Sequence, residues 1–87
     1  MMIIEYSDSF REGVQQLSPE TKKQLKKKLE LMVTNPRHPS LRSNKIQGID
    51  GIFEASVNMD IRMTWQYTED GILLRKIGEH DKTLSNP

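Results

Sequence analysis

Three side chains in the second half of the chain are of types that can move protons or hold a phosphate, namely His80, Arg62 and Asp60. His80 lies in the stretch IGEHDKTL, residues 77–84, directly after a segment that alternates like a strand. An imidazole changes its charge near neutral pH, a carboxylate can accept a proton, and a guanidinium can contact a phosphate through two parallel N–H groups. If these three residues meet, they could support acid–base chemistry at a phosphate.

The alternation of two predicted strands, 52–58 and 62–68, indicates which residues share a face of the sheet. One face carries the apolar set, which consists of Phe53, Ala55, Val57, Met63, Trp65 and Tyr67. The opposite face carries Glu54, Ser56, Arg62, Thr64 and Gln66. Asp60 has the parity of Arg62, and His80 could reach the same surface from beyond the last strand. We therefore expect an acid, a guanidinium and an imidazole on one exposed polar face.

Each of these residues also has an ordinary structural explanation. Polar residues on the outer face of an antiparallel sheet are the default arrangement. Arg62 beside Glu54 or Asp60 could be a surface ion pair worth about 0–1 kcal/mol. His80 could be a solvated loop residue, and His38 falls in a predicted turn. Two separated histidines without a third ligand do not suggest a zinc site.

Two helices are predicted in the first half of the chain, after a short strand at residues 2–6. Ser9 followed by Glu12 fits a capping box for the first helix. Ser18 and Pro19 fit the N-cap and first residue of the second helix. The buried positions are expected to be Phe10, Val14 and Leu17 on the first helix, and Leu25, Leu29 and Met32 or Val33 on the second. The prolines within residues 35–40 end the second helix.

From Leu41 onward the periodicity is that of strands. Residues 41–47 are a possible strand, 48–51 a turn, 69–71 a hairpin turn and 72–77 the last strand. Strands joined by short turns usually pair with their neighbours, so three of them should form a meander. The predicted fold is a single α+β domain, residues 1–87. In it the N-terminal strand and an antiparallel helical hairpin pack on one face of a mostly antiparallel, twisted sheet.

Composition limits the class of protein and its expected location. The chain has no cysteine, which excludes a disulfide framework and thiolate chemistry. No apolar run approaches the roughly 20 residues of a membrane span, and the first residues lack the pattern of a signal peptide, so we expect a cytoplasmic protein with no membrane contact. Residues 1–44 hold eight Lys and Arg against five Asp and Glu, whereas residues 45–87 hold five against seven. The basic excess gathers at residues 22–30, either as the solvated face of a helix or as an attraction for phosphates or an acidic partner.

Several segments, taken in order, resemble the RelE/ParE toxin superfamily over nearly the whole chain. They are QLKKKLELMVTNPRH, NKIQG, IFEASVNMDIRMTWQY and GILLRKIGEHD. The most specific pieces are the arginine-containing strand DIRMTWQY and the terminal element IGEHD. The resemblance implies a RelE-like fold.

For function, the resemblance implies a toxin of a type II toxin–antitoxin system that cuts mRNA in the ribosomal A site. RNA-cleaving members need no metal or other cofactor. The ribose 2′-hydroxyl attacks the adjacent phosphorus and leaves a 2′,3′-cyclic phosphate and a free 5′-hydroxyl. The implied partners are a cognate antitoxin, mRNA and the ribosome.

The resemblance also implies residue roles. Arg62 lies where the family keeps an arginine for the scissile phosphate, and His80 lies where YafQ- and YoeB-type members carry a histidine that acts as general acid. Asp60 matches an acidic position of those types and is assigned to base or histidine-orienting duty.

Other positions depart from the family pattern. Glu54 and Ser56 replace the lysines of RelE-type members, and Ser56 and Asn44 fall where YafQ-type members have histidines. Leu84 stands near the usual place of an aromatic residue. Glu54 or Lys45 could supply a missing base. These departures leave two alternatives open, a ParE-like toxin that binds DNA gyrase without cleaving nucleic acid, and a degenerate homologue that only binds an antitoxin.

Overall fold

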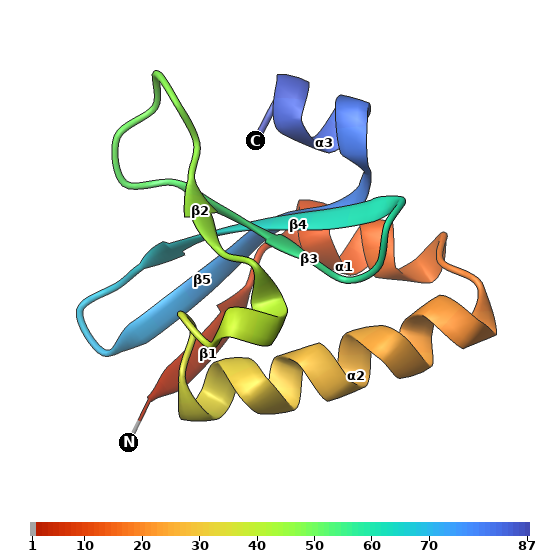
Figure 1. Ribbon diagram of the computed structural model, residues 1–87, viewed down its shortest axis with the longest axis horizontal. Coiled ribbons are helices and arrows are strands. Elements are labelled where there is room, and N and C mark those ends of the chain that lie inside the picture. The colour runs from red at the N-terminus through yellow and green to blue at the C-terminus, as the bar shows by residue number, and fades with distance from the viewer. Residues whose placement is uncertain (1) are drawn as a thin grey trace.

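The computed structural model describes residues 2–87, and it centres on a five-stranded sheet with the order β1-β5-β4-β3-β2 (Figure 1). Along the chain the elements are β1 (Ile3–Tyr6), α1 (Asp8–Gln15), α2 (Pro19–Thr34), a short 3-10 helix η1 (Pro39–Leu41), β2 (Asn44–Lys45), β3 (Phe53–Ser56), β4 (Ile61–Tyr67), β5 (Gly71–Glu79) and α3 (His80–Ser85).

The topology confirms the predicted α+β fold. Strands β3, β4 and β5 form the expected antiparallel meander, and β2 adds to it antiparallel. The first strand, β1, pairs parallel with the last strand, β5. Helices α1 and α2 lie on one side of the sheet, and α3 lies on the other (Figure 1). This third helix was not predicted, because six residues are too few for an apolar stripe to show in the sequence.

The predicted start of the first helix is wrong and that of the second is confirmed. Ser7, and not Ser9, is the N-cap of α1: its Oγ accepts a hydrogen bond from the backbone N–H of Phe10 at 3.0 Å. Ser9 lies inside the helix, so the capping box with Glu12 does not form. The side chain of Ser18 caps α2 by accepting from Thr21 N–H at 3.2 Å.

The buried stripe of α2 is narrower than predicted. Leu25 and Met32 are buried and Leu29 is partly buried, but Val33 is 53% exposed. Each residue turns the helix by about 100°, so Val33 follows Met32 out of the stripe. The helix ends at Thr34, as expected from the following prolines.

The strands differ from the predictions mainly in length. The predicted strand at 41–47 shrinks to Asn44–Lys45, because Leu41 is instead fully buried in η1. β5 runs two residues beyond the predicted end and continues directly into α3. The predicted turn at 48–51 is confirmed, with positive φ at Gly48 and Gly51.

The core lies between the sheet and the helical hairpin. It contains Phe10, Leu25, Met32, Leu41, Phe53, Ala55, Val57, Met63, Trp65, Ile72, Leu74 and Ile77. Phe53 stacks on Trp65 with ring centroids 4.5 Å apart, whereas Tyr67, predicted in the core, is 50% exposed at its edge. Within residues 2–87 no helix has the length and apolar character needed to cross a membrane.

Gly71 allows β1 to join the sheet, and its replacement gives a test of this pairing. It pairs with Ile3, and a Cβ at this position would collide with the Ile3 backbone, 2.6 Å from its nitrogen. We expect Gly71→Ala to lower the free energy of unfolding by about 1–3 kcal/mol, measured by denaturant titration. Gly78→Ala on the same strand is the control. Its Cβ would meet only Thr83 Oγ1 at 3.1 Å, so an equal loss in both variants would contradict the explanation.

Candidate active site

A row of directly paired residues crosses the sheet and places Arg62 at its centre. Arg62 on β4 pairs with Ser56 on β3 and with Gly78 on β5. Paired residues share a face, and the neighbouring row of Ala55, Met63 and Ile77 is buried in the core. Arg62 and Ser56 therefore point away from the helical hairpin, as the alternation predicts.

The turn between β3 and β4 is organised by Asn58. Its Oδ1 accepts from the backbone N–H groups of Asp60 and Ile61, both at 2.8 Å. Its Nδ2 donates to Gln24 Oε1 on α2 at 2.8 Å, which ties the turn to the helix. Sequence reasoning missed this role, although an Asn two residues before an Asp in a turn is a known signal for such a backbone contact.

The β3–β4 turn fixes one side of the Arg62 guanidinium. Arg62 Nη1 donates to the carbonyl oxygens of Asn58 (2.5 Å), Met59 (3.1 Å) and Ile61 (3.3 Å). Among residues 2–87, no acceptor is found for Nε or Nη2, and no carboxylate pairs with Arg62. The surface ion pair with Glu54 or Asp60 that the sequence allowed does not form, so a guanidinium edge remains available for a ligand.

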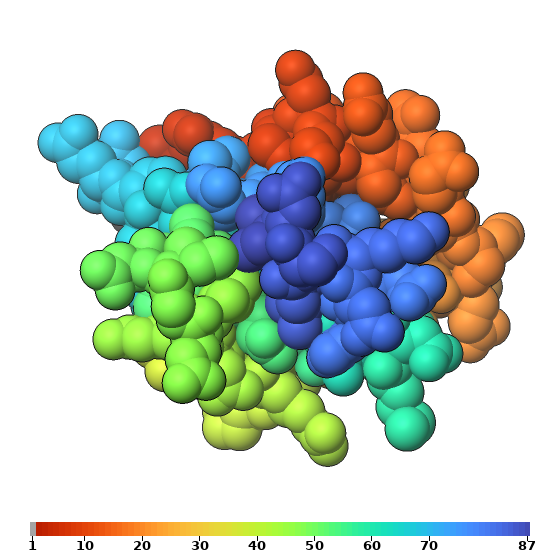
Figure 2. All heavy atoms as spheres, turned by 90° about the horizontal axis from the view of Figure 1, so that it is seen from above, coloured from red at the N-terminus to blue at the C-terminus, as the bar shows by residue number. Residues whose placement is uncertain are grey.

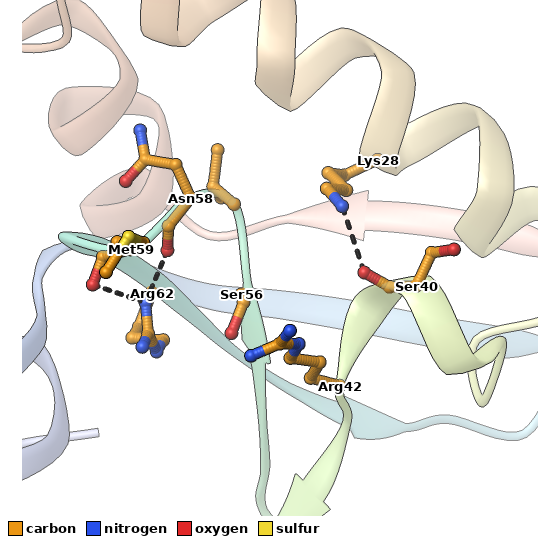
Figure 3. Close-up of a pocket in the computed structure, with 8 residues that line it drawn as sticks. Lys28, Ser40, Arg42, Ser56, Asn58, Met59 and Arg62 are labelled. Atoms are coloured by element: carbon orange, nitrogen blue, oxygen red, sulfur yellow. Dashed lines mark hydrogen bonds between the residues drawn. The ribbon is translucent and has the colours of Figure 1, made fainter.

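Arg62 lines a pocket of about 320 Å³ together with two further cations. The lining residues are Lys28, Ser40, Arg42, Ser56, Val57, Asn58, Met59 and Arg62. None of them is acidic. In Figure 3 the Ser56 side chain lies between those of Arg42 and Arg62. Lys28 and Arg42 were not among the predicted site residues, because only the fold brings the middle of α2 and the end of η1 to the β3–β4 turn.

His80 is the first residue of α3 and not a loop residue. Its backbone N–H donates to the Asp60 carbonyl at 3.0 Å, which extends the β4–β5 pairing by one row. Its Nδ1 lies 3.0 Å from Asp81 Oδ1, and its side chain is 48% exposed. The structure records no partner for Nε2 within residues 2–87, so this nitrogen is accessible to a ligand.

Asp60 is next to His80 through the backbone, but its carboxylate does not hold the imidazole. The neighbour that does so is Asp81. The Asp60 side chain is exposed in the turn and makes no ion pair or hydrogen bond that the described chain records. Neither Asp60 nor His80 lines the pocket of Arg62. They occupy a row two residues beyond Arg62 and Gly78, with Ile61 and Glu79 between.

The other predicted site residues, Glu54, Asn44 and Lys45, divide between the two faces of the sheet. Glu54 pairs with Asn44 and with Thr64, so these three share the face of Arg62. Lys45 pairs with Phe53, whose side chain is in the core, and Lys45 therefore belongs to the opposite face at the sheet edge. Of the two residues considered as a replacement base, only Glu54 lies on the face of Arg62.

The polar face is less open than predicted, because α3 covers its middle. Figure 2 shows this face, with α3 in dark blue between the green β2–β3 loop and the blue-green β3–β4 turn. Thr64, predicted to be exposed, is fully buried, and its Oγ1 donates to the Pro87 carbonyl at 3.2 Å. Arg75 Nε donates to the same oxygen at 3.2 Å. These two bonds fasten Pro87, just beyond α3, to β4 and β5 and so help to position the helix that begins at His80.

Within residues 2–87 no group of three or more potential ligands among His, Cys, Asp and Glu is close enough to hold a metal ion. The site contains one fixed guanidinium in a cationic pocket, an accessible imidazole nitrogen, and the carboxylates of Glu54 and Asp60, for which residues 2–87 provide no recorded ion pair. This set can bind a phosphate and transfer protons at its edges.

The sheet order, the helical hairpin beneath it and the short helix across its other face define the RelE-like fold of small toxins. The solved structure of YafQ from E. coli strain BL21(DE3) superposes with a TM-score of 0.77, at 21% identity over 94% of this chain and 97% of that chain. A chain of the RelB–RelE antitoxin–toxin complex from Methanococcus jannaschii gives a TM-score of 0.78, at 14% identity over 95% and 99%. A chain of the intact E. coli RelBE toxin–antitoxin complex gives 0.74, at 18% identity over 92% and 98%.

No protein-family model and no curated protein sequence matches the chain. At these identities the structural likeness establishes the fold alone. The resemblance to the RelE/ParE superfamily predicted from the sequence is thus confirmed as a shared fold.

Proposed function

We propose that this protein is the toxin of a type II toxin–antitoxin system and that it cleaves mRNA in the ribosomal A site without a metal ion. The observation that carries the proposal is the guanidinium of Arg62, which is fixed on one side by the β3–β4 turn, unpaired on the other and set in a pocket without acids. His80, with its accessible Nε2, pairs with Asp60 two rows further along the sheet. Solved structures with this fold include a DinJ–YafQ toxin–antitoxin complex.

In the proposed reaction the 2′-oxygen of a ribose forms a bond to the adjacent phosphorus, and the bond from phosphorus to the 5′-oxygen breaks. The proton of the 2′-hydroxyl passes to a carboxylate, and His80 gives a proton to the leaving 5′-oxygen. Arg62 contacts the non-bridging oxygens, where negative charge develops in the transition state. The products are a 2′,3′-cyclic phosphate and a 5′-hydroxyl.

The geometry of an in-line displacement favours Glu54 over Asp60 as the base. The attacking and leaving oxygens lie on opposite sides of the phosphorus, so the base and the acid must flank Arg62 from opposite sides. Asp60 and His80 are adjacent through their backbones and stand on the same side of Arg62. Glu54 lies on β3, two rows beyond Arg62 in the other direction. Asp60 then contributes through its backbone carbonyl, which accepts from His80 N–H and holds the start of α3.

This assignment predicts unequal effects of two isosteric changes. We expect Glu54→Gln to slow cleavage by about 10²–10⁴-fold, the range of a lost general base. We expect Asp60→Asn to slow it by less than about tenfold, since its carboxylate carries no proton in the main step. Single-turnover cleavage on programmed ribosomes measures both. The reverse order of effects would return the role of base to Asp60.

The proposed partners are mRNA, the ribosome and a cognate antitoxin, and the proposed compartment is the cytoplasm, where all three meet. An antitoxin that covers the cationic pocket would have to be acidic on its contact surface, and its association rate would then fall with rising ionic strength. An association rate that does not respond to salt would contradict this form of inhibition.

The function is tested by inducing the chain alone in cells, following growth and translation, and mapping mRNA 5′ ends by primer extension. Fixed cuts within codons, together with growth arrest, would support the proposal. Growth arrest with intact mRNA would instead favour a ParE-like action on DNA gyrase. No growth arrest would favour a degenerate homologue that only binds an antitoxin.

A further inference from the structure

The cationic pocket gathers more positive charge than one phosphate contact requires. Lys28 comes from the middle of α2, Arg42 from the residue after η1 and Arg62 from β4. The other lining residues are neutral. The one ion pair that the structure records within residues 2–87 joins His80 and Asp81, outside this pocket. Like charges brought together without counter-charges repel, and a bound anion would offset that repulsion.

The backbone at Arg42 supports a role beyond packing. Arg42 has φ 50° and ψ 44°, in the left-handed region, and it is the one non-glycine residue with positive φ among those described. This conformation favours glycine, so an arginine there carries strain that the side chain does not recover through any recorded protein contact. Residues held in this way concentrate at binding sites.

Lys28 is held near Arg42 by a hydrogen bond to η1. Its Nζ donates to the Ser40 carbonyl at 2.9 Å, which links α2 to η1 just before Arg42. An ammonium has three donors, so two remain for a ligand. The pocket volume of about 320 Å³ is about ten times the roughly 30 Å³ share of one water, and has room for more than one phosphate.

We propose that Lys28 and Arg42 form a second phosphate subsite, which binds the RNA phosphate next to the one held by Arg62. The proposal rests on the proposed function and extends it, because it defines the path of the RNA strand across the pocket. In this arrangement the RNA backbone would pass from Lys28 and Arg42, past Ser56, to Arg62, whose side chains lie in this order across the pocket (Figure 3).

The test compares two non-cleavable ligands, a 2′-deoxy dinucleotide with one phosphate and a 2′-deoxy trinucleotide with two, by NMR titration of the full chain. We expect the parent protein to bind the trinucleotide several-fold more tightly. We also expect the dependence of log Kd on log salt to be steeper for it, by about 0.7 for the added phosphate. In the Lys28→Gln/Arg42→Gln variant both differences should vanish, while dinucleotide binding at Arg62 remains.

Two further variants separate binding from folding. Lys26→Gln removes the same charge from an exposed position of α2 that does not line the pocket, and it should leave the trinucleotide advantage intact. Arg42→Gly removes the guanidinium and suits the left-handed backbone. We therefore expect weaker trinucleotide binding with a Tm that is unchanged or higher.

The inference is overturned if the parent shows no trinucleotide advantage, or if the advantage survives in the double variant. It is also overturned if an acidic peptide of equal charge displaces the trinucleotide more effectively than a second trinucleotide does, since the subsite would then fit a protein partner. Because these ligands cannot be cleaved, the outcome is independent of the mRNA-mapping experiment. If mRNA is cut but the double variant keeps the trinucleotide advantage, the proposed function stands and the subsite does not. If mRNA is not cut but the double variant loses the advantage that the parent shows, the subsite stands and the cleavage does not.

Discussion

Replacing His80 with glutamine is expected to abolish growth arrest and to slow mRNA cleavage by about 10²–10⁴-fold, the usual contribution of a general acid. Glutamine is similar in size and can keep a hydrogen bond to Asp81, which lies 3.0 Å from the imidazole Nδ1. It cannot give a proton to a leaving alkoxide. Single-turnover cleavage on ribosomes, with circular dichroism to confirm folding, measures the effect.

The other histidine provides a matched control. His38 Nδ1 accepts from Ser40 N–H at 3.1 Å at the start of η1, so its role is in the fold. His38→Gln should leave the cleavage rate within a few-fold of the parent. Asp81→Asn, which weakens the hold on the imidazole without removing the proton donor, should fall between the two. If His80→Gln remains as toxic as the parent, the nuclease mechanism is wrong.

Replacing Arg62 with alanine is expected to lower kcat by about 10²–10³-fold, the cost of removing one preorganised donor from the developing charge. The reason is that Arg62 lines the pocket and has Nε and Nη2 without an acceptor among residues 2–87, while Nη1 is held by the turn carbonyls. The experiment is single-turnover cleavage at saturating ribosomes, because a defect at saturation reports on the transition state and not on binding.

The Arg62 variant also removes bonds to the turn, so a fold effect has to be separated from a catalytic one. Arg62→Lys keeps the charge but loses the two-pronged contact, and we expect it to recover only part of the rate. Arg37→Ala removes an arginine that lies over the Phe53 ring, 5.2 Å from its centroid and outside the pocket. It should keep the full rate. A rate loss in Arg37→Ala equal to that in Arg62→Ala would point to general loss of charge or stability.

Much of the fold could be predicted from local signals. Ser18 and Pro19 mark the start of α2 through hydrogen bonding and a fixed φ, which depend on adjacent residues only. Alternation in β3 and β4 correctly places Arg62 and Ser56 opposite the core, because the pleat has a period of two. The same rule fails for Thr64, whose burial depends on where α3 and Pro87 settle.

The candidate site was predictable in part for the same reason. His80, Arg62 and Asp60 fall within two rows of one another because they lie at, or just beyond, the adjoining ends of β4 and β5, and the strand pattern of the sequence predicts those ends. Lys28, Arg42 and Asn58 were missed because contacts between distant elements decide their positions. Asn58 reaches Gln24 across 34 residues of sequence, and Lys28 reaches Ser40 across 12. Periodicity carries no information about such pairs.

The parallel pairing of β1 with β5 determines when, during synthesis, the candidate site can assemble. During synthesis β1 emerges first, yet its partner, residues 71–74, leaves the ribosomal exit tunnel only after the helical hairpin and strands β2, β3 and β4. Until then the sheet lacks its last strand, and His80 has not reached Asp60. The site can therefore assemble only after β5 and the start of α3 have both left the tunnel, however early β1 and the helical hairpin appear.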